Sequence, residues 1–325
     1  MIKKLLIFLL IISPIFASAQ YRNLSKKRSS VRTGNSFAKR KKPRPEFIIG
    51  AGASNFLGEL GGANQIGTFF VRDLEFKATR PSAQIAIRYK FNNRFAVKGG
   101  FYYQLLNGSD KLTKEPFRNN RNLSFRSNVL EVSGQLEFFI TKEQQGSRYK
   151  IKNAKGLKNY DFQAYLFAGV GGFYFNPQAK YRGNWENLQP LGTEGQGLAD
   201  GPGKKYSRFS VCIPYGIGVK EAITKEFALG LEIGIRKTFT DYIDDVSGVY
   251  YDNAALRAAR GDMAADLADP SLLNMPAELG GNSIGGIQSG AGQVRGHSNH
   301  KDAYMFMNIT LSYKIPAKRR TRSKF

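Results

Sequence analysis

The sequence contains one cysteine, Cys212, and two histidines, His297 and His300. A single cysteine cannot form a disulfide within the chain, so the fold is not held together by cross-links. These three residues also lack the Cys/His spacing of a zinc site. After residue 16, no segment reaches the roughly 18 uninterrupted apolar residues that a membrane-spanning helix requires. The sequence therefore excludes a disulfide-stapled domain, a Cys/His zinc domain and a bundle of membrane helices.

The N-terminus has the three parts of a secretory signal peptide. Lys3 and Lys4 precede an apolar run over residues 5–16, and Ala17-Ser18-Ala19 provides an A-x-A cleavage site. The apolar run is about a dozen residues long, which is short for an uncleaved membrane anchor. We therefore expect residues 1–19 to be removed on export.

Acidic residues are scarce, with 25 Asp and Glu against 49 Lys and Arg. Such a balance is common in nucleic-acid-binding proteins, but export argues against nucleic acid as a partner. Ten basic and no acidic residues lie in the segment 21–44, and six basic and no acidic residues lie in 314–325. We therefore predict two basic tails, residues 20–45 and 316–325, of which the first is disordered until it meets a partner. The tail residues expected to bind an acidic partner are Arg22, Lys26, Lys27, Arg28, Lys39, Arg40, Lys41, Lys42, Arg319 and Arg320.

Residues 227–239 alternate between apolar and polar for longer than a soluble strand needs. Leu229 and Leu231 belong to one face and Glu232 and Arg236 to the other, because successive side chains of a strand point to opposite faces. Lipid on one side and a narrow polar lumen on the other favour this pattern in a membrane-spanning strand. Alternation recurs in eight segments, residues 47–58, 83–91, 95–105, 130–140, 164–173, 209–220, 227–239 and 304–313.

Eight such segments, joined by connections that mostly alternate between long and short, predict an eight-stranded antiparallel transmembrane β-barrel over residues 46–315. An even number of strands returns the chain to its starting side, so both basic tails would lie in the periplasm and the long loops outside the cell. The alternative fold is a soluble β-sandwich or lipocalin-like barrel, whose apolar faces would point inward.

The interior of an eight-stranded barrel is just wide enough for side chains to fill it. We therefore expect the charged residues of the polar faces to pair with one another and plug the lumen, with Cys212 packed among them. These residues are Arg88, Lys90, Lys98, Lys220, Arg236, Glu131, Glu137 and Glu232. A conducting pore is not expected.

The longest loop, residues 241–301, holds the only histidines and therefore the only candidates for histidine-dependent catalysis. His297, Ser298, His300 and Asp302 supply the groups of a nucleophilic constellation, but a glycine-rich loop gives such a site little preorganisation. We therefore predict no enzymatic activity and no cofactor.

The beginning of the same loop is rich in aspartate and tyrosine. Asp241, Asp244 and Asp245 have oxygen ligands suited to Ca²⁺, but their spacing is not that of an EF-hand, and we expect them to be solvated, with no metal bound. Tyr242 and Tyr250 lie in a stretch too apolar for a freely solvated loop. We therefore expect residues 241–252 to cap the barrel mouth, with mobile chain beyond residue 253 and room for one short helix at 254–267.

The run Arg236-Lys237-Thr238-Phe239-Thr240-Asp241-Tyr242-Ile243-Asp244-Asp245-Val246-Ser247-Gly248-Val249-Tyr250-Tyr251-Asp252 resembles the signature of the PorG family, and Gly58-Glu59-Leu60-Gly61-Gly62 is a supporting match. PorG-like proteins are outer-membrane barrels of the type IX secretion system of Bacteroidota. The resemblance covers residues 46–315 and implies a component without known catalysis, associated with the PorK lipoprotein and the PorN ring. The motif residues singled out are Glu59, Asp241, Tyr242, Asp244, Asp245 and Tyr250.

The leading hypothesis is a non-catalytic outer-membrane barrel that contacts membrane lipid and anchors a periplasmic PorK-like lipoprotein and PorN-like ring, with peptidoglycan as another partner for the tails. A lipid-modifying enzyme that uses His297 or His300 is the first alternative. A free-standing barrel with an adhesive or structural role is the second.

Overall fold

The computed structural model describes residues 44–58, 60, 78–112, 116–141, 161–224, 226–272, 290–296, 298 and 301–315. All of them belong to one compact unit, residues 43–325. The predicted signal peptide, most of the N-terminal tail, the C-terminal tail, Glu59, His297 and His300 lie outside the described residues.

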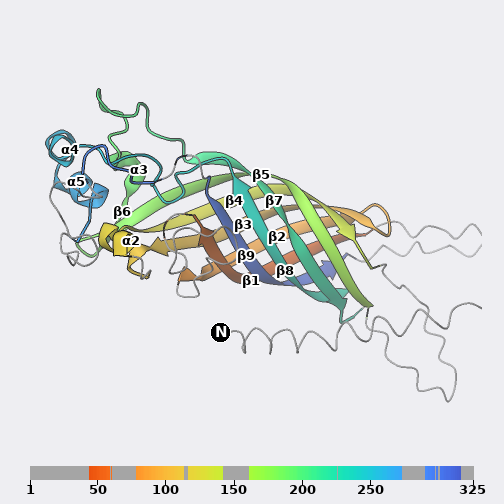
Figure 1. Cartoon of the computed structure of the whole chain (residues 1–325). Helices are drawn as coiled ribbons and strands as arrows, with labels where there is room; N and C mark the ends of the chain where they lie inside the picture. The colour runs from red at the N-terminus through yellow and green to blue at the C-terminus, as the bar shows by residue number, and fades with distance from the viewer. Residues whose placement is uncertain are drawn as a thin grey trace, which may run out of the picture. The chain divides into compact units, whose positions relative to one another are not determined.

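Eight long strands form a single antiparallel sheet that closes on itself (Figure 1). They are β1 (Pro45–Leu57), β2 (Arg80–Lys90), β3 (Phe95–Ser109), β4 (Ser124–Phe139), β5 (Asp161–Tyr181), β7 (Phe209–Ala222), β8 (Phe227–Thr238) and β9 (Ala303–Lys314). Neighbouring strands pair in chain order, and the pairing of β1 with β9 closes the ring. A ninth strand, β6 (Asn184–Asn187), pairs only with the end of β5 beyond the ring. The predicted eight-stranded antiparallel barrel is confirmed.

The two ends of the barrel differ. The register places Glu46 beside Lys314, at the same end as the turns after β2 and β7. We call this end the terminal rim and the opposite end, which carries the long connections, the loop rim. The short helices lie beyond the loop rim (Figure 1). They are η3 (Asp110–Leu112), α2 (Pro116–Arg121), α3 (Leu188–Leu191), α4 (Asn253–Arg260) and α5 (Asp262–Ala268).

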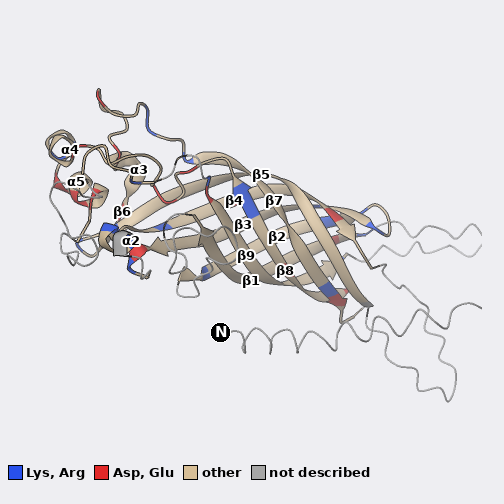
Figure 2. Ribbon diagram, in the orientation of Figure 1, with Lys and Arg blue, Asp and Glu red and all other residues tan. Residues whose placement is uncertain are grey.

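Side chains alternate between the two faces of the barrel wall along most of each strand. The outward face is apolar and exposed, with Val132 at 65%, Ile309 at 60% and Ile87 at 58%. The inward face holds buried charges and aromatic rings. Charged positions are sparse along the walls (Figure 2). An apolar exterior around a filled polar interior is the arrangement of an outer-membrane barrel and the reverse of a soluble one.

Glycine gives the interior room for large rings. A Cβ atom on Gly218 would lie 2.3 Å from Cζ of Tyr165, whose ring fills the lumen opposite it. No described helix is long and apolar enough to cross a membrane.

Several predicted boundaries were wrong. β1 begins at Pro45, two residues earlier than expected, and β4 begins six residues earlier, at Ser124. The strand predicted over 164–173 continues to Tyr181, and the chain then turns into β6 and α3. The single helix expected within 254–267 is two helices, because Gly261 has a φ of 84° that an α-helix does not contain.

Candidate functional site

The lumen is filled by a network of buried ion pairs. The guanidinium of Arg88 lies 2.9 Å from Glu137, 3.2 Å from Glu46 and 3.3 Å from Glu232. The ammonium of Lys98 is 2.9 Å from Glu232, and that of Lys220 is 2.6 Å from Glu46. Since all of these side chains are at most 4% exposed, each charge is stabilised by its partners rather than by water.

Neutral groups complete the shell of Glu232. Its carboxylate accepts hydrogen bonds from the Tyr165 hydroxyl at 2.6 Å and from Gln84 Nε2 at 3.0 Å. Closer to the loop rim, the guanidinium of Arg236 lies 2.9 Å from Glu131, which also accepts from the Tyr304 hydroxyl at 3.2 Å. The Arg236 guanidinium packs 4.2 Å from the ring of Phe306. Arginine is suited to this position because its planar group pairs with a carboxylate and stacks on a ring at once.

The charges of this network balance. Four bases and four acids are buried inside the barrel wall, namely Arg88, Lys98, Lys220 and Arg236 with Glu46, Glu131, Glu137 and Glu232. The expectation that paired charges fill the interior is confirmed for seven of the eight predicted residues. The eighth, Lys90, is only half-buried, and its ammonium donates to Gln163 Oε1 at 2.7 Å and lies 3.9 Å from the ring of Phe139. Among the described residues, the lumen contains a neutral, hydrogen-bonded plug rather than an aqueous path.

Residues 241–250 form a folded cap on the loop rim. Ile243 and Val246 are fully buried against strand residues Phe125, Phe175 and Tyr304. The expectation that this stretch caps the barrel mouth is confirmed, and these three aromatic side chains are the surface on which it packs. The prediction of mobile chain beyond residue 253 was wrong for 253–268, because α4 and α5 pack on one another and on α3.

A second group of buried charges holds the cap in place. Glu194 accepts hydrogen bonds from the backbone N–H groups of Ser247 at 2.9 Å and Gly248 at 3.1 Å. Its carboxylate is also 3.0 Å from the guanidinium of Arg295. Segments about 50 and 100 residues apart in the chain therefore meet at one carboxylate. We call residues 193–196, 241–250 and 294–296 the cap.

Asp245 is a fully buried acid of the cap. It accepts hydrogen bonds from Thr193 Oγ1 at 2.5 Å and from the Tyr206 hydroxyl at 2.6 Å, and Arg295 lies 3.9 Å away. Burial raises the pKa of Asp245 to about 6, although Arg295 and the two hydroxyl groups lower it. The ring of Tyr206 stacks on Tyr242 with centroids 4.4 Å apart.

The expectation of solvated aspartates was wrong, because Asp241, Asp244 and Asp245 are at most 2% exposed. Asp244 accepts from the N–H of Val246 at 3.0 Å, and Asp302 accepts from that of Ile243 at 2.9 Å. These carboxylates fix the cap backbone. Within the described part of the chain, no three His, Cys, Asp or Glu side chains are grouped to hold a metal ion.

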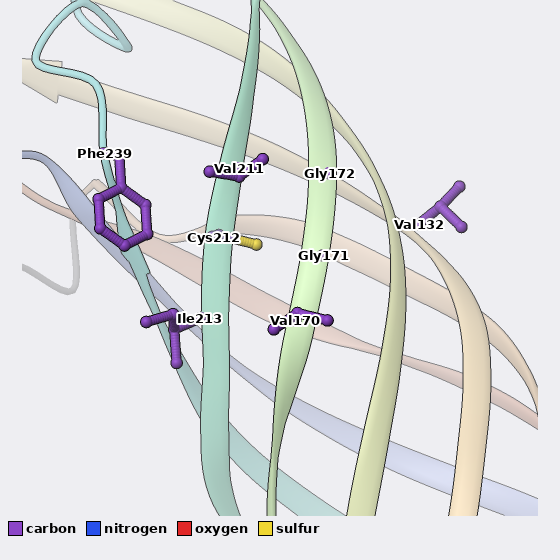
Figure 3. Close-up of a pocket in the computed structure, with 8 residues that line it drawn as sticks. All are labelled: Val132, Val170, Gly171, Gly172, Val211, Cys212, Ile213 and Phe239. Atoms are coloured by element: carbon purple, nitrogen blue, oxygen red, sulfur yellow. The ribbon is translucent and has the colours of Figure 1, made fainter.

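An apolar groove of about 540 Å³ lies on the outer wall between β4, β5 and β7 (Figure 3). Gly171 and Gly172 form its floor, and the side chains around it are Val132, Val170, Val211, Ile213 and Phe239, with the buried Cys212 on the inner side of the wall. Its lining offers no acid, base or nucleophile apart from the buried Cys212, so it is a surface for apolar contact and not a catalytic site.

The structure brings together some of the predicted motif residues and adds others. Asp241, Tyr242, Asp244, Asp245 and Tyr250 all belong to the cap, whereas Glu59 and the ten basic tail residues lie outside the described residues. Sequence reasoning missed Glu46, Glu194 and Arg295. Glu46 could have been found by extending the alternation of β1 one step back from Phe47, but no periodic pattern marks Glu194 or Arg295.

Comparison with known proteins gives distant matches. A family described as "Domain of unknown function (DUF6089)" matches residues 195–265, which span β7, β8, most of the cap and α4. No curated protein matches. Ail, the attachment invasion locus protein of Yersinia pestis, has 10% identity and a TM-score of 0.34 over 84% of this chain and 99% of its own.

Two other solved structures are similarly distant. Neisserial surface protein A has 9% identity and a TM-score of 0.35 over 83% of this chain and 97% of its own. The outer membrane protein OprG from Pseudomonas aeruginosa has 10% identity and a TM-score of 0.31 over 85% of this chain and 98% of its own. At this distance the matches carry no statement about what the present chain binds or does.

Proposed function

We propose that this protein is a non-catalytic outer-membrane component of the type IX secretion system that anchors periplasmic proteins, a PorK-like lipoprotein and a PorN-like ring. The observation that supports an anchoring role is the combination of a plugged lumen with both chain ends at one rim. A neutral, close-packed interior argues against a pore. Two basic tails that leave the same rim share one compartment, where a single partner can meet both.

The assignment to the secretion system depends on the resemblance of residues 236–252 to the PorG signature. In this chain most of the stretch folds into the cap, where Asp244 accepts a hydrogen bond from the N–H of Val246 and Asp245 accepts hydrogen bonds from the hydroxyls of Thr193 and Tyr206. The motif therefore has a structural use. A motif that fixes a cap is compatible with a family of scaffolding barrels. It does not require a catalytic group at this position.

The tails are the proposed contact with the partner. A flexible basic arm can attach to an acidic surface at little geometric cost, and two arms on one rim raise each other's effective concentration. Such contacts are screened over about 8 Å at physiological ionic strength, so binding should weaken in high salt.

The test is co-purification from mild detergent together with a secretion assay. Deleting residues 22–44 should leave the barrel folded, judged by its heat-dependent mobility on a denaturing gel, while weakening recovery of the lipoprotein and secretion. A tail of the same length with neutral residues in place of Lys and Arg should behave like the deletion, and a tail with the same composition in scrambled order should behave like the natural one. Unchanged partner recovery and secretion in the deletion variant would reject the anchoring role of the tails.

A separate arm addresses the enzyme alternative. Replacing His297 and His300 by alanine should leave the lipid A and phospholipid composition of the cells unchanged. Altered lipids with normal secretion would replace the anchoring proposal with a lipid-modifying activity.

A further inference from the structure

On the outer wall of β4, β5 and β7, the side chains change from apolar to basic towards the loop rim. On β5 the outward positions run apolar from Ala164 to Tyr174, a span of ten residue steps. At about 3.3 Å per residue and a tilt of about 40°, ten residues rise about 25 Å, which is the height of the apolar band of an outer-membrane barrel. The residues of β5 that follow Tyr174 therefore lie at the level of the lipid headgroups.

The register aligns this upper edge across four strands. Tyr174 is opposite Leu130 of β4 and Phe209 of β7, and Leu130 is opposite Tyr103 of β3. Aromatic side chains in a row at the end of an apolar band are typical of the membrane interface. The Tyr103 hydroxyl donates to Asn128 Oδ1 at 2.9 Å. The polar groups of the outer wall therefore begin at this row of aromatic residues, on its side nearer the loop rim.

Immediately beyond this row, two arginines are held on the outer face. The guanidinium of Arg126 stacks 3.9 Å from the ring of Trp185, and its Nε donates to Gln178 Oε1 at 3.0 Å. The guanidinium of Arg208 lies 5.4 Å from the ring of Tyr174 and donates to Asn176 Oδ1 at 3.3 Å. Both side chains are partly exposed.

A chain of amides joins the two arginines. Gln178 and Asn176 each donate to the same oxygen, Oδ1 of Asn187, at 2.8 Å. The remaining N–H groups of Arg126 and Arg208 have no acceptor, and no carboxylate pairs with either residue, among the residues that the structure describes. The arginines are thus fixed in place with donors that face away from the protein.

The apolar groove lies on the mid-membrane side of the two arginines. Along β5, Gly172 is three residues from the level of Arg208 and six residues from the level of Arg126. Gly172 is opposite Val132 on β4 and Val211 on β7, one outward position nearer mid-membrane than Tyr174. A Cβ atom on Gly172 would meet nothing within 4 Å, so the missing side chain leaves open space on the lipid side (Figure 3).

We propose that this face binds one phosphorylated membrane lipid, with its phosphate on Arg126 and Arg208 and an acyl chain in the groove over Gly172. Guanidinium groups bind phosphate through paired, charge-assisted hydrogen bonds, and a groove lined by valine suits a hydrocarbon chain. Lys180, which is exposed and faces outward on β5, adds charge at the same edge. This inference uses the placement of the barrel in a membrane and is independent of the secretion role.

The test is native mass spectrometry of the full-length protein in detergent, titrated with lipid A and, separately, with dephosphorylated lipid A. Arg126→Gln with Arg208→Gln should raise the dissociation constant for lipid A at least tenfold and leave that for the dephosphorylated lipid unchanged. Arg126→Lys with Arg208→Lys should recover part of the affinity. Gly172→Leu, which fills the groove, should weaken both lipids severalfold.

Matched variants control for charge and for side-chain bulk. Lys111→Gln with Lys301→Gln removes the same charge from exposed positions outside β4, β5, β6 and β7, and Gly99→Leu adds the same side chain to an open position on β3. Both should bind lipid A as the natural protein does, including any background binding by the basic tails. Equal affinity for the two lipids in the natural protein, or no loss in the arginine variant relative to the lysine control, would overturn the proposal.

Discussion

Replacing Glu232 by glutamine tests whether the lumen network stabilises the barrel through its charge balance. Among the four described acids of the lumen, Glu232 has the most partners, since Lys98, Arg88, Tyr165 and Gln84 all bind it. Glutamine has nearly the same shape but no charge, so the substitution leaves four buried bases facing three acids. Removing one partner of a buried ion pair typically costs about 3 to 5 kcal/mol of unfolding free energy.

The expected value is at the lower end, about 3 kcal/mol, because other acids remain close to both bases. Lys98 keeps Glu137 at 3.5 Å, and Arg88 keeps both Glu137 and Glu46. Adding Lys98→Met to Glu232→Gln removes one base and one acid together. The double variant should therefore be more stable than the sum of the two single losses predicts, by about 1 to 3 kcal/mol.

The assay is equilibrium unfolding in urea of protein refolded into lipid vesicles, with the folded fraction read from heat-dependent gel mobility. Glu221→Gln is the control, because Glu221 lies on β7 without an ion pair among the described residues, and it should change stability by less than about 0.5 kcal/mol. Strictly additive effects of Lys98→Met and Glu232→Gln, or a Glu232→Gln variant as stable as the natural protein, would refute the reasoning.

Three further predictions concern the two faces of the wall and the cap. Leu231→Arg places a charge on the lipid face near the middle of β8 and should cost about 2 to 4 kcal/mol in the same unfolding assay. Cys212 is 2% exposed and should react with a maleimide only after boiling, so rapid labelling of folded protein would contradict its inward position. Because the pKa of Asp245 is raised to about 6 in the folded cap, the cap binds a proton that the unfolded chain releases at lower pH. Its stability should therefore fall as pH rises from about 4 to 6, and hydrogen exchange of residues 241–250 should show this in the natural protein but not in Asp245→Asn.

The barrel could be predicted from sequence because a strand with lipid on one side has apolar residues at every second position and polar or small residues between them. The prediction of β8 needed only that Leu229, Leu231 and Ile233 alternate with Gly230 and Glu232. The same reasoning predicted a closed interior, since the inward residues were charged and of both signs.

The alternation failed where a strand leaves the membrane. Beyond Tyr174 the outward residues of β5 are the polar Asn176, Gln178 and Lys180, so the sequence no longer shows the apolar outward face of a membrane strand. The inward residues Phe175 and Ala179 are nevertheless buried. At the other rim, Pro45 and Glu46 resembled the basic tail that precedes them. A polar outward face is expected at headgroup level, and it makes strand ends look like loops.

The cap could be predicted only in part. Its apolar residues indicated burial, and Ile243 and Val246 are buried as expected. The contacts that fix it could not be derived, because Glu194, Asp245 and Arg295 come from three segments without periodicity and far apart in the chain. Isolated acidic residues in a loop are usually solvated, and only the tertiary contacts show that these are not.

The pairing of β1 with β9 has a consequence for how this protein is made. Twelve residue pairs, from Glu46 with Lys314 to Leu57 with Ala303, join segments about 250 residues apart. Such contacts are the slowest to form, because the chain between them must be ordered before they stabilise it. Until the last strand arrives, β1 and β8 each present an unpaired edge that lipid cannot satisfy. The addition of the last strand should therefore determine whether the barrel forms. A variant that lacks only residues 303–315 should remain an open sheet and be degraded by proteases, and should not close into a smaller barrel.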